Sequence, residues 1–136
     1  MSEGAPAPLL LDTVAFIYWH ADSPRLGTRA RAALLDAMTR PIFVSAVSAF
    51  EISTKVRLGK LHVPAAILSD FQYVVEADGF RLLDLDAPAA AQAGGLESPH
   101  RDPFDRLLAA QALTRDLAIV TNDPVFASDF GVPVLW

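Results

Sequence analysis

The sequence predicts a single α/β domain, a three-layer α/β/α sandwich with a central, mainly parallel sheet. Short apolar runs alternate along the chain with longer segments of helical periodicity, and this alternation is typical of repeated strand–helix units. The chain has 136 residues, the size of one ordinary domain, and 52% of them are hydrophobic while 20% are charged. Such a composition favours a well-filled core over disorder. No repeat or low-complexity linker divides the chain after Pro8.

The N-terminal part of the chain is expected to supply one strand and two helices. Leu9–Leu11 is an apolar run of the kind that forms a buried strand. Thr13–His20 is expected to be helical, up to a turn at Ser23-Pro24. The alanine- and leucine-rich segment Thr28–Thr39 predicts a second helix. Pro41 then interrupts the pattern, because proline lacks the backbone donor that a helix needs.

The middle of the chain is expected to contain a second strand, over Ile42–Val44, and two longer helices. Ser45 is placed to cap the first of these helices, because its hydroxyl can accept an N–H group that the first turn leaves unpaired. That helix is expected to reach Leu58 and to stop at the glycine that follows. The second helix is expected over Pro64–Asp78, again closed by a glycine.

The last third of the chain is expected to add the remaining strands. Phe80–Leu83 predicts a third strand, and a short alanine-rich helix follows over Pro88–Ala93 until two glycines end it. After a polar loop, an aspartate followed by a proline predicts the start of a strong helix over Asp102–Arg115. Ala118–Val120 predicts a fourth strand, and Val132–Leu135 a short fifth strand at the edge of the sheet.

Composition restricts the classes of function and of environment. The formal net charge is -5, so the chain lacks the basic surface that is usual for nucleic-acid binding, and any basic contacts must be local. The absence of cysteine excludes disulfides and thiolate metal sites and is consistent with a reducing cytoplasm. No apolar run approaches the roughly 18–20 residues that span a bilayer, so no membrane contact is expected. Residues Met1–Pro8, rich in small residues and proline, are expected to form a flexible leader to the domain at 9–136.

Four carboxylates are expected to meet at one edge of the sheet. Asp12 directly follows the first strand, and Asp123 closely follows the fourth. Glu51 lies in the helix after the second strand, and Asp105 lies in the first turn of the helix before the fourth. Ligands of open α/β sheets bind outside the carboxyl ends of the strands. Because clustered carboxylates resist joint ionisation, the pattern favours a bound Mg²⁺ or Mn²⁺, which prefers oxygen ligands and can activate water toward a phosphodiester.

Each of these residues also has a simple structural interpretation. Asp12 and Asp102 suit helix N-caps, and Asp102 does so especially because a proline follows it. Asp105 is an acidic residue that the helix dipole favours, and Asp123 before a proline is typical of a turn. Glu51 is harder to explain in this way, since its neighbours are small or apolar and a partly buried carboxylate needs a partner. A lysine four residues later could supply an ion pair.

Taken together, these motifs resemble the PIN-domain family, and most of all the VapC-type toxins of bacterial toxin–antitoxin pairs. The resemblance runs from about Leu9 to Trp136. Its motifs are Leu10-Leu11-Asp12-Thr13, Ser48-Ala49-Phe50-Glu51-Ile52, His100-Arg101-Asp102-Pro103-Phe104-Asp105-Arg106 and Thr121-Asn122-Asp123. The third of these is the most specific, together with the leucines, alanines and glutamine that follow it.

The resemblance implies a Mg²⁺- or Mn²⁺-dependent endoribonuclease with a PIN-like fold. In the family's pattern Asp12, Glu51, Asp105 and Asp123 fall on the acidic positions that serve as catalytic residues and metal ligands. Members are usually homodimers that a small antitoxin inhibits, so an RNA substrate, a cognate antitoxin and a homodimer are the expected partners. Apolar helices such as the one over 28–39 are a possible dimer interface. Asn122 departs from the family, which often has arginine there.

Basic residues near the acidic positions are candidates for holding RNA phosphates. Those proposed for this role are Lys55, Arg57, Arg101 and Arg106. Their alternative interpretation is a solvated helix surface with local ion pairs. His100 could touch substrate, although a loop histidine is more often structural.

Three other classes of protein share some of these features. A phospho-accepting receiver domain also gathers carboxylates at strand ends, but it needs an acidic pair after the first strand, where this chain has Asp12 alone. A nucleotide-binding enzyme is poorly supported, because neither a G-x-G-x-x-G motif nor a Walker loop occurs. The more serious alternative is a catalytically inactive PIN-like module that binds RNA or protein. Intact carboxylates at all four positions argue against it.

Overall fold

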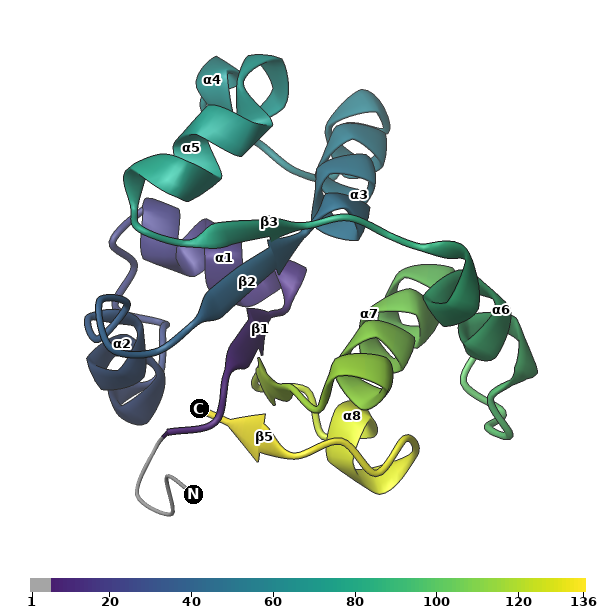
Figure 1. Ribbon diagram of the computed structural model, residues 1–136. Coiled ribbons are helices and arrows are strands. Elements are labelled where there is room, and N and C mark those ends of the chain that lie inside the picture. Colours follow the sequence, from purple (N-terminus) through teal and green to yellow (C-terminus); the bar gives the residue numbers. More distant parts are fainter. Residues whose placement is uncertain (1–5) are drawn as a thin grey trace.

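A computed structural model describes residues 6–136 as one five-stranded sheet in which every pair of neighbouring strands is parallel, in the order β3-β2-β1-β4-β5 (Figure 1). The strands are β1 Leu9–Leu11, β2 Ile42–Ser45, β3 Arg81–Leu83, β4 Ala118–Val120 and β5 Val134–Leu135. The first part of the expected leader, residues 1–5, lies outside the described residues. Ala7 and Pro8 are hydrogen-bonded through their carbonyls, to Arg40 Nε at 2.7 Å and to Ala118 N at 3.1 Å.

Helices cover both faces of this sheet, so the predicted α/β/α sandwich is confirmed. They are α1 Thr13–His20, α2 Thr28–Leu34, α3 Ala46–Arg57, α4 Ala65–Ser69, α5 Phe71–Ala77, α6 Ala87–Gly95, α7 Pro103–Arg115 and α8 Val125–Ser128. None of the helices within residues 6–136 has the length and apolar character needed to cross a membrane.

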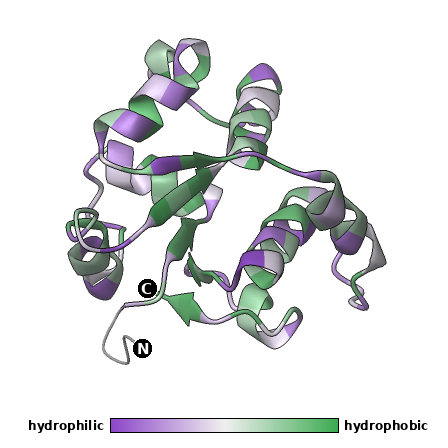
Figure 2. Ribbon diagram, in the orientation of Figure 1, coloured by the Kyte–Doolittle hydropathy of each residue, from purple (hydrophilic) through white to green (hydrophobic). Residues whose placement is uncertain are grey.

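The core consists of two apolar layers separated by the sheet. Leu9 and Leu11 of β1 point into a layer built with α1, α2, α4 and α5, whereas Leu10 points into a layer with α7 and α8. All three leucines are fully buried, as expected for a central strand with helices on both sides. Figure 2 shows the same distribution, with hydrophobic residues along the strands and hydrophilic ones toward the outer helix surfaces.

Several predicted helix ends are confirmed in atomic detail. The Ser45 hydroxyl accepts the N–H of Val47 at 3.0 Å and so caps α3, and Asp102 caps α7 by accepting the N–H groups of Phe104 and Asp105. Gly59, directly after the C-cap of α3, has a φ of 73°, a conformation that glycine adopts without strain.

Other helices differ from the prediction. The expected helix over 28–39 ends at Leu34, because residues 35–39 form turns closed by short-range bonds such as Thr39 N to Asp36 O. The expected helix over 64–78 is two helices, since Asp70 leaves the helical conformation with φ -137° and ψ 47°. The two glycines at 94–95 are the last residues of α6 rather than its terminator. The short helix α8 was not predicted.

Candidate functional site

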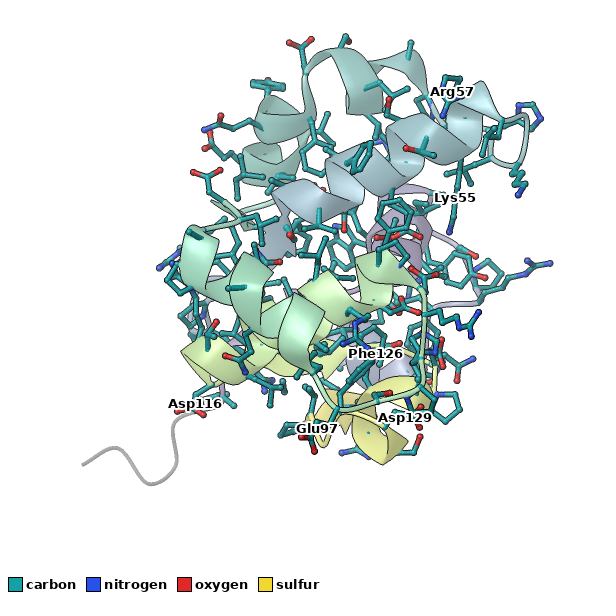
Figure 3. The ribbon with its side chains drawn as sticks, turned by 90° about the vertical axis from the view of Figure 1, so that its right-hand side faces the viewer. Lys55, Arg57, Glu97, Asp116, Phe126 and Asp129 are labelled. Carbon is teal, nitrogen blue, oxygen red and sulfur yellow. The ribbon has the colours of Figure 1, made fainter. Side chains whose placement is uncertain are left out.

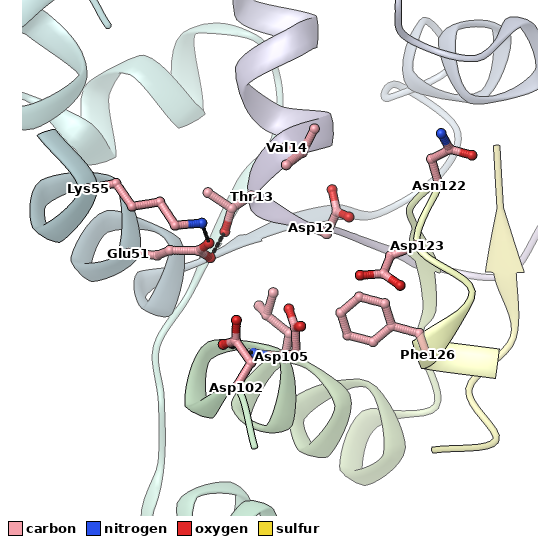
Figure 4. A pocket seen from close by; sticks show the side chains of 11 residues that line it. Asp12, Thr13, Val14, Glu51, Lys55, Asp102, Asp105, Asn122, Asp123 and Phe126 are labelled. Atoms are coloured by element: carbon pink, nitrogen blue, oxygen red, sulfur yellow. Dashed lines mark hydrogen bonds and ion pairs between the residues drawn. The ribbon is translucent and has the colours of Figure 1, made fainter. Parts of the chain in front are cut away.

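A cavity of about 350 Å³ opens at the carboxyl ends of β1 and β4 (Figure 4). The four acidic residues singled out in the sequence all line it, and they reach it from four different elements or connections. Its lining residues are Asp12, Thr13, Val14, Glu51, Lys55, Asp102, Asp105, Leu108, Asn122, Asp123 and Phe126. The parallel sheet therefore brings the predicted carboxylates to one place, as the rule for open α/β sheets anticipates.

Asp12 lies between the central strand and α1 and is buried, with 8% of its surface exposed. Its Oδ1 accepts the N–H of Ala15 at 2.7 Å, so the capping interpretation is correct for this residue, and the same side chain also lines the cavity. The pKa of Asp12 is raised to about 6, chiefly by burial and also by the charges of Asp105 and Glu51, whereas the hydrogen bonds from Thr121 and Ala15 act to lower it. Asp12 is thus a carboxylate that a nearby positive charge would stabilise.

Glu51 is equally buried, with 6% exposed, and its two oxygens have different partners. The hydroxyl of Thr13 donates to Oε1 at 2.6 Å and lies 2.8 Å from the Ser48 hydroxyl. Oε2 forms an ion pair with Lys55 Nζ. The lysine partner was considered from the sequence, but the Thr13–Ser48 pair was missed. The only signals for it were a serine one helical turn before Glu51 and a threonine after Asp12.

Asp105 lies in the first turn of α7 and contacts the side chain of His100, with 2.8 Å between Oδ2 and Nε2. Its pKa is raised, mainly by burial and also by the charges of Asp102 and Asp123, while the hydrogen bond from His100 lowers it. The ring of His100 also packs edge-on against Phe130. The loop histidine therefore has a structural place, and it holds one of the site carboxylates.

Asp123 is the most exposed of the four carboxylates and sits at the start of α8. Its Oδ1 accepts the N–H of Val125 at 3.0 Å, and its own N–H donates to the Thr121 hydroxyl. This turn, together with the proline at 124, explains why a short helix begins here. Asp123 is therefore a turn residue, as its sequence context suggested, and it also lines the cavity.

The basic residues named from the sequence are distributed unevenly around the site. Lys55 lines the cavity, whereas Arg57 and Arg101 are exposed and lie outside its lining. Figure 3 shows Lys55 and Arg57 on the same helix, α3. Arg106 is directed elsewhere, because its guanidinium donates to five backbone carbonyls between residues 93 and 100. Arg106 thus holds the loop that carries His100, and its donors are not free for a phosphate.

The donor set of the cavity fits a hard divalent cation, since carboxylate oxygens are the ligands that Mg²⁺ and Mn²⁺ prefer. The pKa values of Asp12 and Asp105 are raised because burial and the neighbouring carboxylates both disfavour the ionised form. As the side chains of residues 6–136 are oriented, no three acidic or histidine groups already surround a common point. Each carboxylate instead has a partner within the protein, so cation binding would require some of these side chains to turn.

The chain is similar to known proteins both in sequence pattern and in fold. The family model described as the PIN domain matches residues 9–128. The sequence matches no curated protein. Among solved structures, DNA-bound VapBC from Salmonella typhimurium superposes with a TM-score of 0.66 at 20% identity, covering 96% of this chain and 98% of that chain. FitAcB from Neisseria gonorrhoeae gives 0.62 at 21% identity, covering 94% and 96%. A VapBC-family toxin–antitoxin protein from Mycobacterium tuberculosis gives 0.53 at 24% identity, covering 96% and 97%.

Proposed function

The chain belongs to the PIN-domain family, and from that premise we propose that it is a metal-dependent endoribonuclease acting as the toxin of a toxin–antitoxin pair. The observation that carries the proposal is the convergence of Asp12, Glu51, Asp105 and Asp123 on one cavity at the carboxyl end of the sheet. Clustering four carboxylates, two of them buried, costs folding free energy, a cost expected only where the cluster serves a function. A cation-dependent reaction on a phosphodiester is such a function.

In this proposal the four carboxylates hold Mg²⁺, or Mn²⁺ in its place. The cation, when bound, offsets the charge of the phosphate and lowers the pKa of water. Thr13 fixes Glu51 by donating to its Oε1, so that the other oxygen faces Lys55. His100 holds Asp105 through the 2.8 Å contact between its Nε2 and Asp105 Oδ2. Among the basic side chains, Lys55 lines the cavity and is the one best placed to contact the substrate phosphate.

The partners in this proposal are an RNA substrate, a cognate antitoxin and a second copy of the chain, in the cytoplasm. Support for the antitoxin comes from the solved structures of similar fold, one of which is described as a toxin–antitoxin complex from Klebsiella pneumoniae. The cavity is strongly acidic, so a basic segment of an antitoxin would complement it and would compete with the cation.

One observation favours a second candidate, a PIN-like module that binds without cleaving. Glu51 is already neutralised by Lys55, and every carboxylate of the site has a partner within the protein. Titration of the purified chain with Mg²⁺ and Mn²⁺ in a calorimeter separates the two candidates. A nuclease must bind the cation at millimolar concentration or below, and Asp12→Asn must weaken that binding. The absence of any binding heat, with the fold intact, would favour the module.

The direct test of the proposed activity is RNA cleavage. Full-length protein freed of antitoxin should cut RNA in the presence of Mg²⁺, and chelation of the metal should stop the reaction. Cleavage that persists in chelator would contradict a metal-dependent mechanism.

A further inference from the structure

An exposed aromatic pair bridges α3 and α7, two of the helices that contribute residues to the cavity wall. Phe50 of α3 and Phe104 of α7 lie with their ring centroids 5.6 Å apart and their planes at 80° to each other. Phe104 is partly buried and packs against the core layer beneath α7. Phe50 has 66% of its surface exposed, and its ring has no polar group that water could hydrogen-bond. The pair therefore presents one anchored ring and one open ring to solvent.

This pair borders the carboxylate cavity. Phe50 directly precedes Glu51, and Phe104 directly precedes Asp105, so each is one residue, about 3.8 Å between Cα atoms, from a residue of the cavity wall. The two helices also contact each other. A chain that leaves the cavity across the α3–α7 contact would therefore come close to the rings.

Charge alone does not explain how this cavity would retain a nucleic acid. Five of its lining side chains are acidic, namely Asp12, Glu51, Asp102, Asp105 and Asp123, and the one cationic lining residue, Lys55, is paired with Glu51. Such a surface repels phosphates, and a single cation in the site does not reverse the whole of that charge. Stacking of a base on an aromatic ring is attractive without any positive charge, and unpaired bases are the ones that can stack in this way.

We propose that Phe50, supported by Phe104, is a stacking platform for an unpaired base of the substrate next to the phosphate held at the carboxylates. The inference rests on the proposed nuclease function and deepens it, because it assigns Phe50 as a residue that positions the RNA beside the carboxylates. A protein partner covering the same ring is the competing occupant. The rings lie close to the acidic cavity, so one RNA strand could contact both. This favours a base over a protein partner as the occupant of the ring.

The test measures binding of a single-stranded RNA oligonucleotide of mixed sequence that carries the fluorescent base 2-aminopurine, with magnesium present. All variants are made in full-length protein carrying Asp12→Asn, so that the RNA stays intact. Phe50→Leu keeps an apolar contact with Phe104 but removes the stacking face, and Phe50→Tyr restores it. Tyr73→Leu is the matched control, because Tyr73 is 73% exposed on α5, away from the cavity.

Phe50→Leu is expected to weaken single-stranded RNA binding by at least about fivefold, the lower end of the effect of losing one stacked base. It should also reduce the quenching of 2-aminopurine, whereas Phe50→Tyr and Tyr73→Leu should retain both. Binding of a duplex RNA should change much less. Equal affinity of Phe50→Leu and its parent for the single strand would overturn the platform. So would an equal loss for single-stranded and duplex RNA, or a loss that follows dissociation of a dimer in light scattering.

Cleavage by the unsubstituted chain, measured on the same RNA, separates failure of this inference from failure of the proposed function. If the RNA is cut but Phe50→Leu binds normally, the platform is wrong and the nuclease stands. If the unsubstituted chain neither binds nor cuts the RNA, the proposed nuclease function is wrong, and so is the proposed stacking of a base on Phe50.

Discussion

Asp12→Asn is expected to make the metal-free protein more stable while removing a carboxylate from the site. Asp12 is buried beneath the cavity, and its pKa is raised from 3.8 to about 6, chiefly by that burial. Because the folded state holds the proton more tightly than the unfolded chain, ionisation of Asp12 costs stability. The cost is absent below pH 3.8, grows as the pH rises between the two pKa values, and is complete above about 6.

The size of the effect follows from the two pKa values. The interval between 3.8 and about 6 corresponds to about 3 kcal/mol at neutral pH, and to about 1 kcal/mol at pH 4.5. Asparagine keeps the volume of the side chain and the oxygen that accepts the Ala15 N–H, and it caps helices as well as aspartate does. The variant should therefore exceed the parent in unfolding free energy by about 2–3 kcal/mol at pH 7.5, with a smaller margin at pH 4.5.

Urea unfolding at a series of pH values, in the presence of a chelator, measures this difference. Asp36→Asn, which removes one exposed carboxylate remote from the cavity, controls for the change in net charge. Added Mg²⁺ should then stabilise the parent more than the variant and so narrow the gap. A variant that is less stable than the parent at neutral pH would show that ionisation of Asp12 does not destabilise the folded protein. A difference in unfolding free energy that does not change with pH would show the same.

Three further predictions concern neighbouring contacts and assembly. Thr13→Val removes the hydroxyl that donates to Glu51, so it should reduce cleavage and lower the unfolding free energy by about 1–3 kcal/mol in urea titration; unchanged values of both would contradict the role of Thr13. Arg106→Lys cannot reproduce the donor pattern to five carbonyls, so limited proteolysis with trypsin should cut faster at Arg101, in the loop that Arg106 holds, while an Arg57→Lys control leaves that rate unchanged. Light scattering of the purified chain should report a dimer, and a monomer at working concentration would count against the proposed assembly.

Local signals in the sequence were sufficient for most of the fold. Leu9–Leu11 is a central strand because nothing polar interrupts it, and Ser45 and Asp102 cap helices through atoms of their own turns. The break at Asp70 and the helix after Pro124 were missed. No proline or glycine marks the break, and the helix at 125–128 is too short for its periodicity to show.

For the candidate site too, some features could be predicted from the sequence and others could not. The convergence of Asp12 and the other three carboxylates follows from strand order and could be anticipated. Its supporting contacts could not, because Thr13 meets Ser48 and Glu51 across 35 and 38 residues of sequence. Arg106 was expected near phosphate, but its acceptors are backbone carbonyls, which no residue type in the sequence reveals.

Cleavage of pooled cellular RNA by the purified, antitoxin-free chain is the most direct test of the proposed metal-dependent nuclease activity. The reaction is run with Mg²⁺, with Mn²⁺ and with chelator, and in parallel with Asp12→Asn, whose fold is checked by circular dichroism. We expect discrete fragments with either metal and none with chelator or with the variant. Cleavage by Asp12→Asn at the rate of the parent, or no cleavage by the folded parent under any condition, would show that the carboxylate site is not a metal-dependent nuclease centre.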